Sequence, residues 1–112
     1  MALVTTTEMF KKAFEGKYSI GAFNINNMEI VQGVLRGAAA LNSAVILQCS
    51  KSALKYAGPR CMHDMVAAIA EETGVDVALH LDHGPDLETV KLCVENGFTS
   101  VMFVLTMIMK KT

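Results

Sequence analysis

The sequence lacks the features that mark a membrane protein, a disulfide framework or a secreted precursor. Its longest apolar stretch, 101–109, is interrupted by Thr106 and is far shorter than the roughly 20 apolar residues that a membrane-spanning helix needs. No basic segment followed by an apolar one stands at the start of the chain, so a secretory signal is not expected. The three cysteines, Cys49, Cys61 and Cys93, are an odd and widely spaced set, which favours reduced thiols in a cytoplasmic protein.

An excess of charge is also missing. The chain has 10 basic and 11 acidic residues, for a formal net charge of −1, and the basic residues are spread along it without forming a stripe. We therefore expect no nucleic-acid partner. What the sequence does have is the composition of one globular domain, with 52% hydrophobic and 19% charged residues over 112 positions.

Helical and strand-like segments alternate along the chain. Thr5 and Glu8 form a capping-box pattern at the start of the first helix, Asn26 or Asn27 can cap the second, and Gly74 ends the third. The strands are continuous apolar runs, which favours an α/β fold with a parallel sheet buried on both faces. The predicted helices are 6–16, 28–41, 61–73 and 86–95, and the predicted strands are 18–24, 44–50, 75–81 and 98–105.

Polar side chains stand at the ends of three of these strands. Asn24 ends the first strand, Ser50 the second, and Asp82 with His83 the third. Ligands bind at the carboxyl ends of the strands in parallel α/β folds, so these positions predict a site. The two-residue period of a strand places His80 and Asp82 on one face, with His83 turned the other way or just past the strand. A metal site here is therefore expected to use one of the two histidines.

Four motifs, "GAFNINNMEI", "ILQCSKSALKYA", "ALHLDHG" and "NGFTSVM", resemble those of the class II fructose-bisphosphate aldolases in both order and spacing. The resemblance covers residues 1–102 and corresponds to about the first third of such an enzyme. It implies the N-terminal half of a (β/α)₈ TIM barrel, with about four parallel strands and their intervening helices. Tagatose-bisphosphate aldolases share the motifs, so the resemblance leaves the choice between fructose and tagatose bisphosphate open.

The resemblance also implies a chemistry and a set of roles. The family cleaves fructose 1,6-bisphosphate reversibly into dihydroxyacetone phosphate and glyceraldehyde 3-phosphate, a step of glycolysis, and its members are commonly homo-oligomers. His83 is then one of three histidines on a catalytic Zn²⁺, and Asp82 exchanges the proton on the C4 oxygen of the sugar. Asn24 and Ser50 correspond to polar residues that orient the site and the substrate.

Each of these assignments has a structural alternative. Asp82 alone fits the N-cap of the following helix, whereas Asn24 and Ser50 fit simple strand ends. His80 suits packing, and Lys51 suits a solvated loop better than a phosphate site. A small phosphate-binding α/β module is an alternative for the whole chain, but it lacks a G-x-G-x-x-G or P-loop signature. A pair of half-barrels closing eight strands is another.

Residues 103–112 depart from the family pattern as a divergent tail. After "SVM" the family continues with a segment resembling Ile-Asp-Gly-Ser-His, whereas this sequence reads "FVLTMIMKKT". Residues 104–112 can be encoded by nucleotides that give a family-like continuation when they are translated in a frame shifted by two positions. We therefore hypothesise that the reading frame is lost near Phe103. The family's later glutamate, two zinc histidines and phosphate loops are absent from these 112 residues. We therefore expect the chain to be inactive alone and prone to aggregate through open sheet edges.

Overall fold

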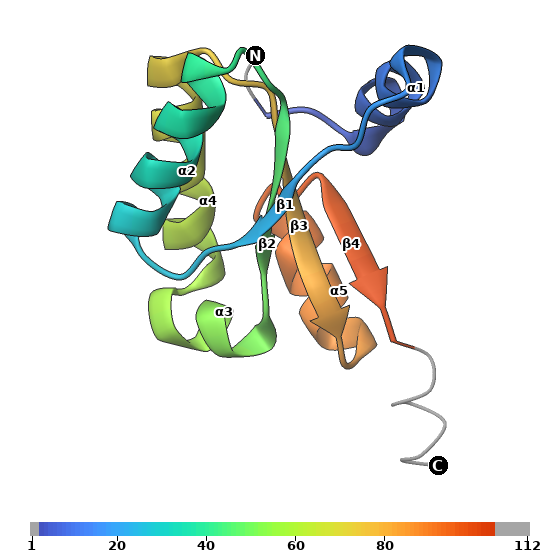
Figure 1. Cartoon of the computed structure of the whole chain (residues 1–112). Coiled ribbons are helices and arrows are strands. Elements are labelled where there is room, and N and C mark those ends of the chain that lie inside the picture. The colour runs from blue at the N-terminus through green and yellow to red at the C-terminus, as the bar shows by residue number, and fades with distance from the viewer. Residues whose placement is uncertain (1–2, 105–112) are drawn as a thin grey trace.

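The computed structural model describes residues 3–104, in which helices and strands alternate as predicted (Figure 1). The predicted tail at 103–112 lies, from residue 105 on, outside the described residues. No helix in this described part is long and apolar enough to cross a membrane. The helices are α1 (Thr6–Gly16), α2 (Met28–Ala40), α3 (Lys51–Ala57), α4 (Pro59–Thr73) and α5 (Leu87–Glu95), and the strands are β1 (Ala22–Asn24), β2 (Val45–Cys49), β3 (Val77–Gly84) and β4 (Ser100–Phe103).

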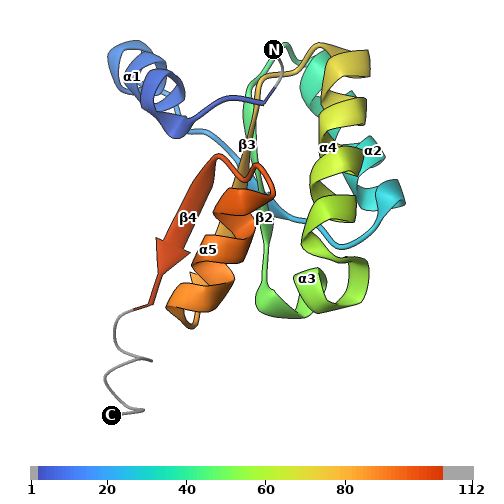
Figure 2. The same ribbon diagram turned by 180° about the vertical axis from the view of Figure 1, so that it is seen from behind.

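The sheet follows the order of the chain. Its four strands are parallel and pair as β1-β2-β3-β4, so the prediction of four parallel strands is confirmed. Helices α2, α3 and α4 lie together along one side of the strands, while α5 lies behind β3 in Figure 1 and in front of it in Figure 2. This sequential order is that of a barrel wall. It has no point where the strand order reverses, which a flavodoxin-like ligand-binding domain requires.

The hydrophobic core lies between the strands and helices α2, α3, α4 and α5. Burial alternates along β2, where Val45, Leu47 and Cys49 are buried and the two residues between them are only half-buried. The prediction of a sheet buried on both faces was therefore wrong for these residues. In a closed barrel the side chains on the inner face of the sheet fill the interior. The four described strands do not enclose such an interior. The largest fully buried side chains are Ile25, Leu35, Leu47, Met62, Leu79 and Leu81.

Several local predictions differ from the structure. Residues 51–57 form α3 instead of a solvated loop, and β1 begins at Ala22 instead of Tyr18. Thr5 is the N-cap of α1, but its side chain makes no capping hydrogen bond, so the capping box is not formed. Helix α4 begins earlier than predicted, at Pro59, where a proline is tolerated because the first helical N–H needs no partner within the helix.

Candidate functional site

The carboxyl end of β3 carries an irregularity that the sequence did not predict. Leu81 pairs with Val101 and Gly84 pairs with Phe103, so three steps along β3 match two steps along β4. The extra residue makes a bulge, which bends a strand and changes the direction of a side chain. His83 lies in this bulge with a φ of 51°, a left-handed conformation that is uncommon for residues with a Cβ.

The bulge places Asp82 and His83 side by side. His83 Nε2 lies 3.7 Å from Asp82 Oδ2, and the side chains of His83 and Asp82 are 67% and 16% exposed. The prediction that His83 turns away from Asp82 or lies past the strand was wrong, because the bulge interrupts the two-residue alternation inside β3. A half-buried carboxylate and an accessible imidazole therefore meet at the end of the strand.

Gly84 makes this arrangement possible. A Cβ at Gly84 would lie 2.5 Å from the backbone oxygen of Met102, so no other residue fits without moving β4. The Gly84 oxygen also accepts a hydrogen bond from the Val104 N–H at 3.0 Å. The glycine of "LDHG" thus lets β4 resume its pairing directly after the bulge.

A row of polar residues crosses all four strands just below this end. The register pairs Asn24 with Gln48, Gln48 with His80, and His80 with Ser100. Gln48 Nε2 donates to Asn24 Oδ1 at 2.9 Å, and His80 Nδ1 lies 2.7 Å from Ser100 Oγ. Gln48 and Ser100 were missed by the sequence analysis. Gln48 could have been found as the one amide inside an otherwise apolar strand, whereas Ser100 is recognisable only from its register with His80.

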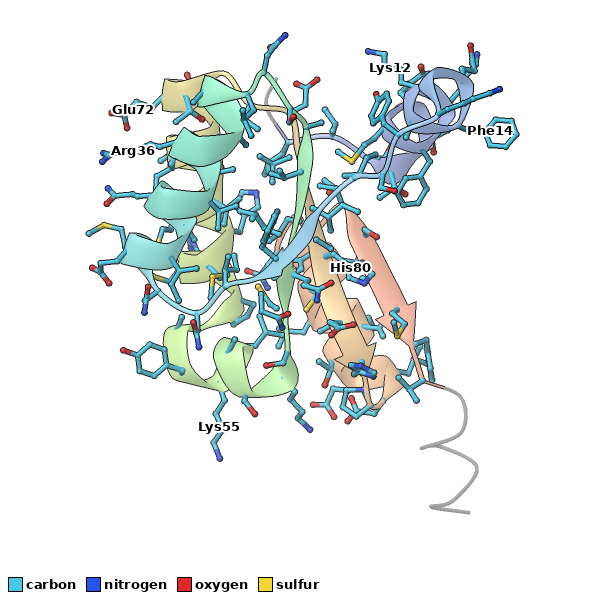
Figure 3. The ribbon with its side chains drawn as sticks, in the orientation of Figure 1. Lys12, Phe14, Arg36, Lys55, Glu72 and His80 are labelled. Atoms are coloured by element: carbon cyan, nitrogen blue, oxygen red, sulfur yellow. The ribbon has the colours of Figure 1, made fainter. Side chains whose placement is uncertain are left out.

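His80 forms part of the sheet surface and not of a metal cluster. It lies between β3 and β4 (Figure 3) and is half-buried. Burial lowers its pKa below the ordinary value of 6.5, and the negative charge of Asp82 opposes part of this effect. The expected packing role for His80 agrees with these contacts.

Ser50 and Asp86 cap two of the helices that start at this end of the sheet. Ser50 Oγ accepts from the Ala53 N–H at 3.2 Å and caps α3, while Asp86 accepts from the Thr89 N–H at 2.7 Å and caps α5. The Thr89 hydrogen bond, more than nearby Lys51, lowers the pKa of Asp86. Because Asp86 caps the helix after β3, the N-cap alternative for Asp82 is wrong. Lys51 lies 3.6 Å from Asp86 and joins the two helix starts.

The described residues do not form a complete metal centre. Within 3–104 there is no group of three His, Cys, Asp or Glu side chains that could hold an ion. His63 is half-buried on α4, where its Nδ1 lies 2.9 Å from Asp64 and its ring packs against Gly97. Burial raises the pKa of the Cys49 and Cys93 thiols to about 12 and about 11. A catalytic zinc typically needs three protein ligands, so His83 and its neighbour do not fit a whole zinc site.

Four sequential parallel strands, with helices connecting them and polar groups at their carboxyl ends, have the arrangement of a segment of a (β/α)₈ barrel. Residues 4–109 match the family model described as fructose-bisphosphate aldolase class-II, and the chain therefore belongs to that family. The match extends past residue 102, the boundary at which the resemblance was expected to end.

Curated relatives and solved structures agree with this assignment. The chain is 49% identical over 100 residues to a fructose-bisphosphate aldolase of Thermus caldophilus, covering 89% of this chain and 32% of the relative. It is 44% identical over 103 residues to one of Giardia intestinalis, covering 91% and 32%. The YdjI aldolase structure from Escherichia coli K12 superposes with a TM-score of 0.81 at 26% identity, over 89% of this chain and 38% of that one. The chain thus spans about a third of the length of its curated relatives, which confirms the resemblance and the half-barrel fold.

Proposed function

We propose that this chain supplies the proton-transferring end of a class II aldolase site, which cleaves fructose 1,6-bisphosphate in glycolysis. The observation that carries the proposal is the β3 bulge, which presents Asp82 and His83 together at the carboxyl end of the sheet. The curated relatives named fructose-bisphosphate aldolase support it. Tagatose bisphosphate stays an alternative substrate.

Asp82 has the role of general base and acid in this proposal. The carboxylate takes the proton of the C4 hydroxyl, the C3–C4 bond breaks, and C4 becomes the aldehyde carbon of glyceraldehyde 3-phosphate. The bonding electrons stay on the dihydroxyacetone phosphate part as an enediolate. In the condensation direction Asp82 returns the proton to the new alkoxide. The role requires a carboxylate within hydrogen-bond reach of the C4 oxygen, and Asp82 is 16% exposed at the end of its strand.

The other polar residues have supporting roles. His83 is proposed as one ligand of the family's zinc. At least one further ligand must then come from outside residues 3–104, because these residues contain no group of three His, Cys, Asp or Glu side chains that could hold an ion. Asn24, fixed by Gln48, and Ser50 are proposed to orient the substrate. Free thiols at Cys49, Cys61 and Cys93 support a cytoplasmic setting.

The experiment uses a chimaera in which this chain replaces the matching residues of the Thermus caldophilus aldolase. Asp82→Asn keeps the shape of the side chain but removes its basicity. We expect kcat for fructose 1,6-bisphosphate cleavage to fall by about 10²-fold or more, since general acid–base catalysis contributes on this scale. KM should change little. Steady-state kinetics measures both.

Asp76→Asn is the matched control, because Asp76 is exposed and precedes the amino end of the same strand. It should leave kcat unchanged. Equal losses in the two variants, or full activity of Asp82→Asn, would remove Asp82 from the catalytic step.

A further inference from the structure

A pocket lies at the amino end of the sheet, at the opposite end of the strands from Asp82. In Figure 1, α1 stands on one side of the strand starts, and the ends of α2 and α4 stand on the other. The pocket encloses about 310 Å³, which is near the lower end of the range for ligand pockets and suits one small molecule. The residues that line this amino-end pocket include Glu8, Lys12, Tyr18, Asn42, Ser43 and Asp76.

Charged side chains of both signs line the amino-end pocket. Glu8 and Lys12 are one helical turn apart on α1, and Asp76 precedes β3. Lys12 extends from the side of α1 nearer to the strands (Figure 3). Within residues 3–104 none of these three side chains takes part in an ion pair. Their charges are therefore free to interact with a ligand.

Two helix C-termini make the pocket more negative. α2 ends at Ala40 and α4 ends at Thr73, and residues beside both ends line the pocket. The aligned peptide dipoles leave about half a negative charge at the C-terminus of a helix. Together with the two carboxylates, these helix ends favour a positive group on the ligand. They disfavour a multiply charged anion such as a sugar phosphate.

Part of the lining is aliphatic. Val4, Met9 and Val75 contribute to the pocket wall, and Met9 and Val75 belong to the buried core, so their positions are fixed by packing. A short aliphatic group on the ligand can pack against them and leave the water. The lining thus matches a molecule that carries a positive group, a negative group and a small apolar part.

We propose that the amino-end pocket binds a free α-amino acid with a short aliphatic side chain. Glu8 accepts hydrogen bonds from the ammonium group, Lys12 donates to the carboxylate, and the aliphatic part packs against Met9. Because the pocket and Asp82 lie at opposite ends of β3, the bound amino acid takes no part in aldol cleavage. The proposal holds whatever the substrate of the aldolase site.

A metal cation and a simple amine are the competing occupants. Either would be attracted by Glu8 and the helix ends, but it would lie near the like charge of Lys12, which is unfavourable. The part of the chain that the structure describes also has no group of three His, Cys, Asp or Glu side chains that could hold a metal ion. A ligand with both charges satisfies both ends of the pocket.

Equilibrium dialysis of the 112-residue chain against radiolabelled L-valine tests the proposal. We expect saturable binding of one valine per chain. Isobutylamine lacks the carboxylate of valine, and 3-methylbutanoate lacks the ammonium group. Each should compete about tenfold or more weakly than valine itself, because each loses one charge-assisted contact. Fructose 1,6-bisphosphate should not compete.

Two variants test the assigned partners. Glu8→Gln and Lys12→Gln should each weaken valine binding by about threefold or more, since each removes one charge from a partly solvated contact. Glu15→Gln and Lys11→Gln are the matched controls, because both residues are exposed on α1 and lie outside the pocket. The controls should bind valine like the natural chain. Far-UV circular dichroism should show the same helix content in all four variants.

The analogue series uses the natural chain and decides the case even if a variant fails to fold. Absence of saturable valine binding would overturn the proposal, as would equal losses in the variants and their controls. Isobutylamine binding as tightly as valine would show a plain amine or cation site. Displacement of valine by fructose 1,6-bisphosphate would place the valine in an anion site and would also contradict the proposal.

Discussion

The backbone of His83 is the residue-scale feature on which the site depends. A φ of 51° on a residue with a Cβ costs about 1–3 kcal/mol and persists only when the surroundings enforce it. Here the β4 pairing on both sides of the bulge enforces it, since Val101 and Phe103 hold Leu81 and Gly84 in place. The strained residue lies where a carboxylate and an imidazole meet, and strained backbone of this kind is concentrated at functional sites.

Gly84→Ala tests this explanation of the bulge. The new Cβ would lie 2.5 Å from the Met102 oxygen, so β4 has to shift, and we expect a loss of about 1–3 kcal/mol in the free energy of unfolding. Urea denaturation measures the change. Gly33→Ala is the control, because its Cβ would meet nothing within 4 Å, and it should be neutral or stabilising by up to about 1 kcal/mol. A Gly84→Ala chain as stable as the control would refute the steric account.

His80 predicts a pH dependence of stability. Burial lowers its pKa in the folded state below 6.5. Above that pH the imidazole is neutral in both the folded and the unfolded state, and its contribution to the stability of the folded state is complete. As the pH falls, the unfolded state binds the proton first, and stability is lost until the folded-state pKa is reached. Urea denaturation from about pH 8 to about pH 5 should show that the free energy of unfolding falls more steeply with falling pH for the natural chain than for His80→Gln. Parallel curves for the two proteins would contradict the prediction.

At the scale of elements, the polar residue that follows β2 has a structural role, because Ser50 caps α3. Ser50 accepts a hydrogen bond from the Ala53 N–H at 3.2 Å, and Lys51 then reaches Asp86 at the start of α5. The two helix starts are thereby tied together beside the end of β3. Ser50 thus has a capping role whether or not it also contacts a substrate.

Ser50→Ala should destabilise the chain by about 0.5–2 kcal/mol, the usual cost of losing an N-cap side chain. Ser52→Ala serves as the comparison, because Ser52 lies in the same helix, is exposed and is not the residue that caps α3. Thermal or urea denaturation of both variants measures the difference. If the free energy of unfolding falls by the same amount in the two serine variants, the Ser50 cap contributes nothing to stability and the capping role is contradicted.

Elements with a local signal were predictable from the sequence, and those that depend on pairing were not. Asn27 capping α2 and Gly74 ending α4 each act within a few residues, so their patterns predicted the helix ends. The bulge at His83 depends on how β3 meets β4, about twenty residues away in the chain, and the two-residue period carries no information about that pairing. Helix α3 was missed because a serine and two lysines after a strand also fit a loop.

At the scale of the whole molecule, residues 3–104 leave the inner face and both edges of the four-stranded sheet uncovered. Phe23 on β1 and Val101, Met102 and Phe103 on β4 are 38–45% exposed. Exposed apolar edges of this kind favour association with other chains, and the expectation of aggregation stays a prediction. The same geometry bears on the proposed site, because a barrel enzyme collects its catalytic residues from the ends of several strands and only four strands are present in the described residues.

The central claim is that this chain carries a single zinc-binding imidazole and a catalytic carboxylate, and that the rest of the site lies elsewhere. Equilibrium dialysis with Zn²⁺, followed by an aldol-cleavage assay on the same sample of the 112-residue chain, tests it directly. The account predicts zinc binding far weaker than the ~10 kcal/mol or more of a complete protein zinc site, with no cleavage of fructose 1,6-bisphosphate. Tight binding of one zinc per chain together with sustained cleavage would contradict it.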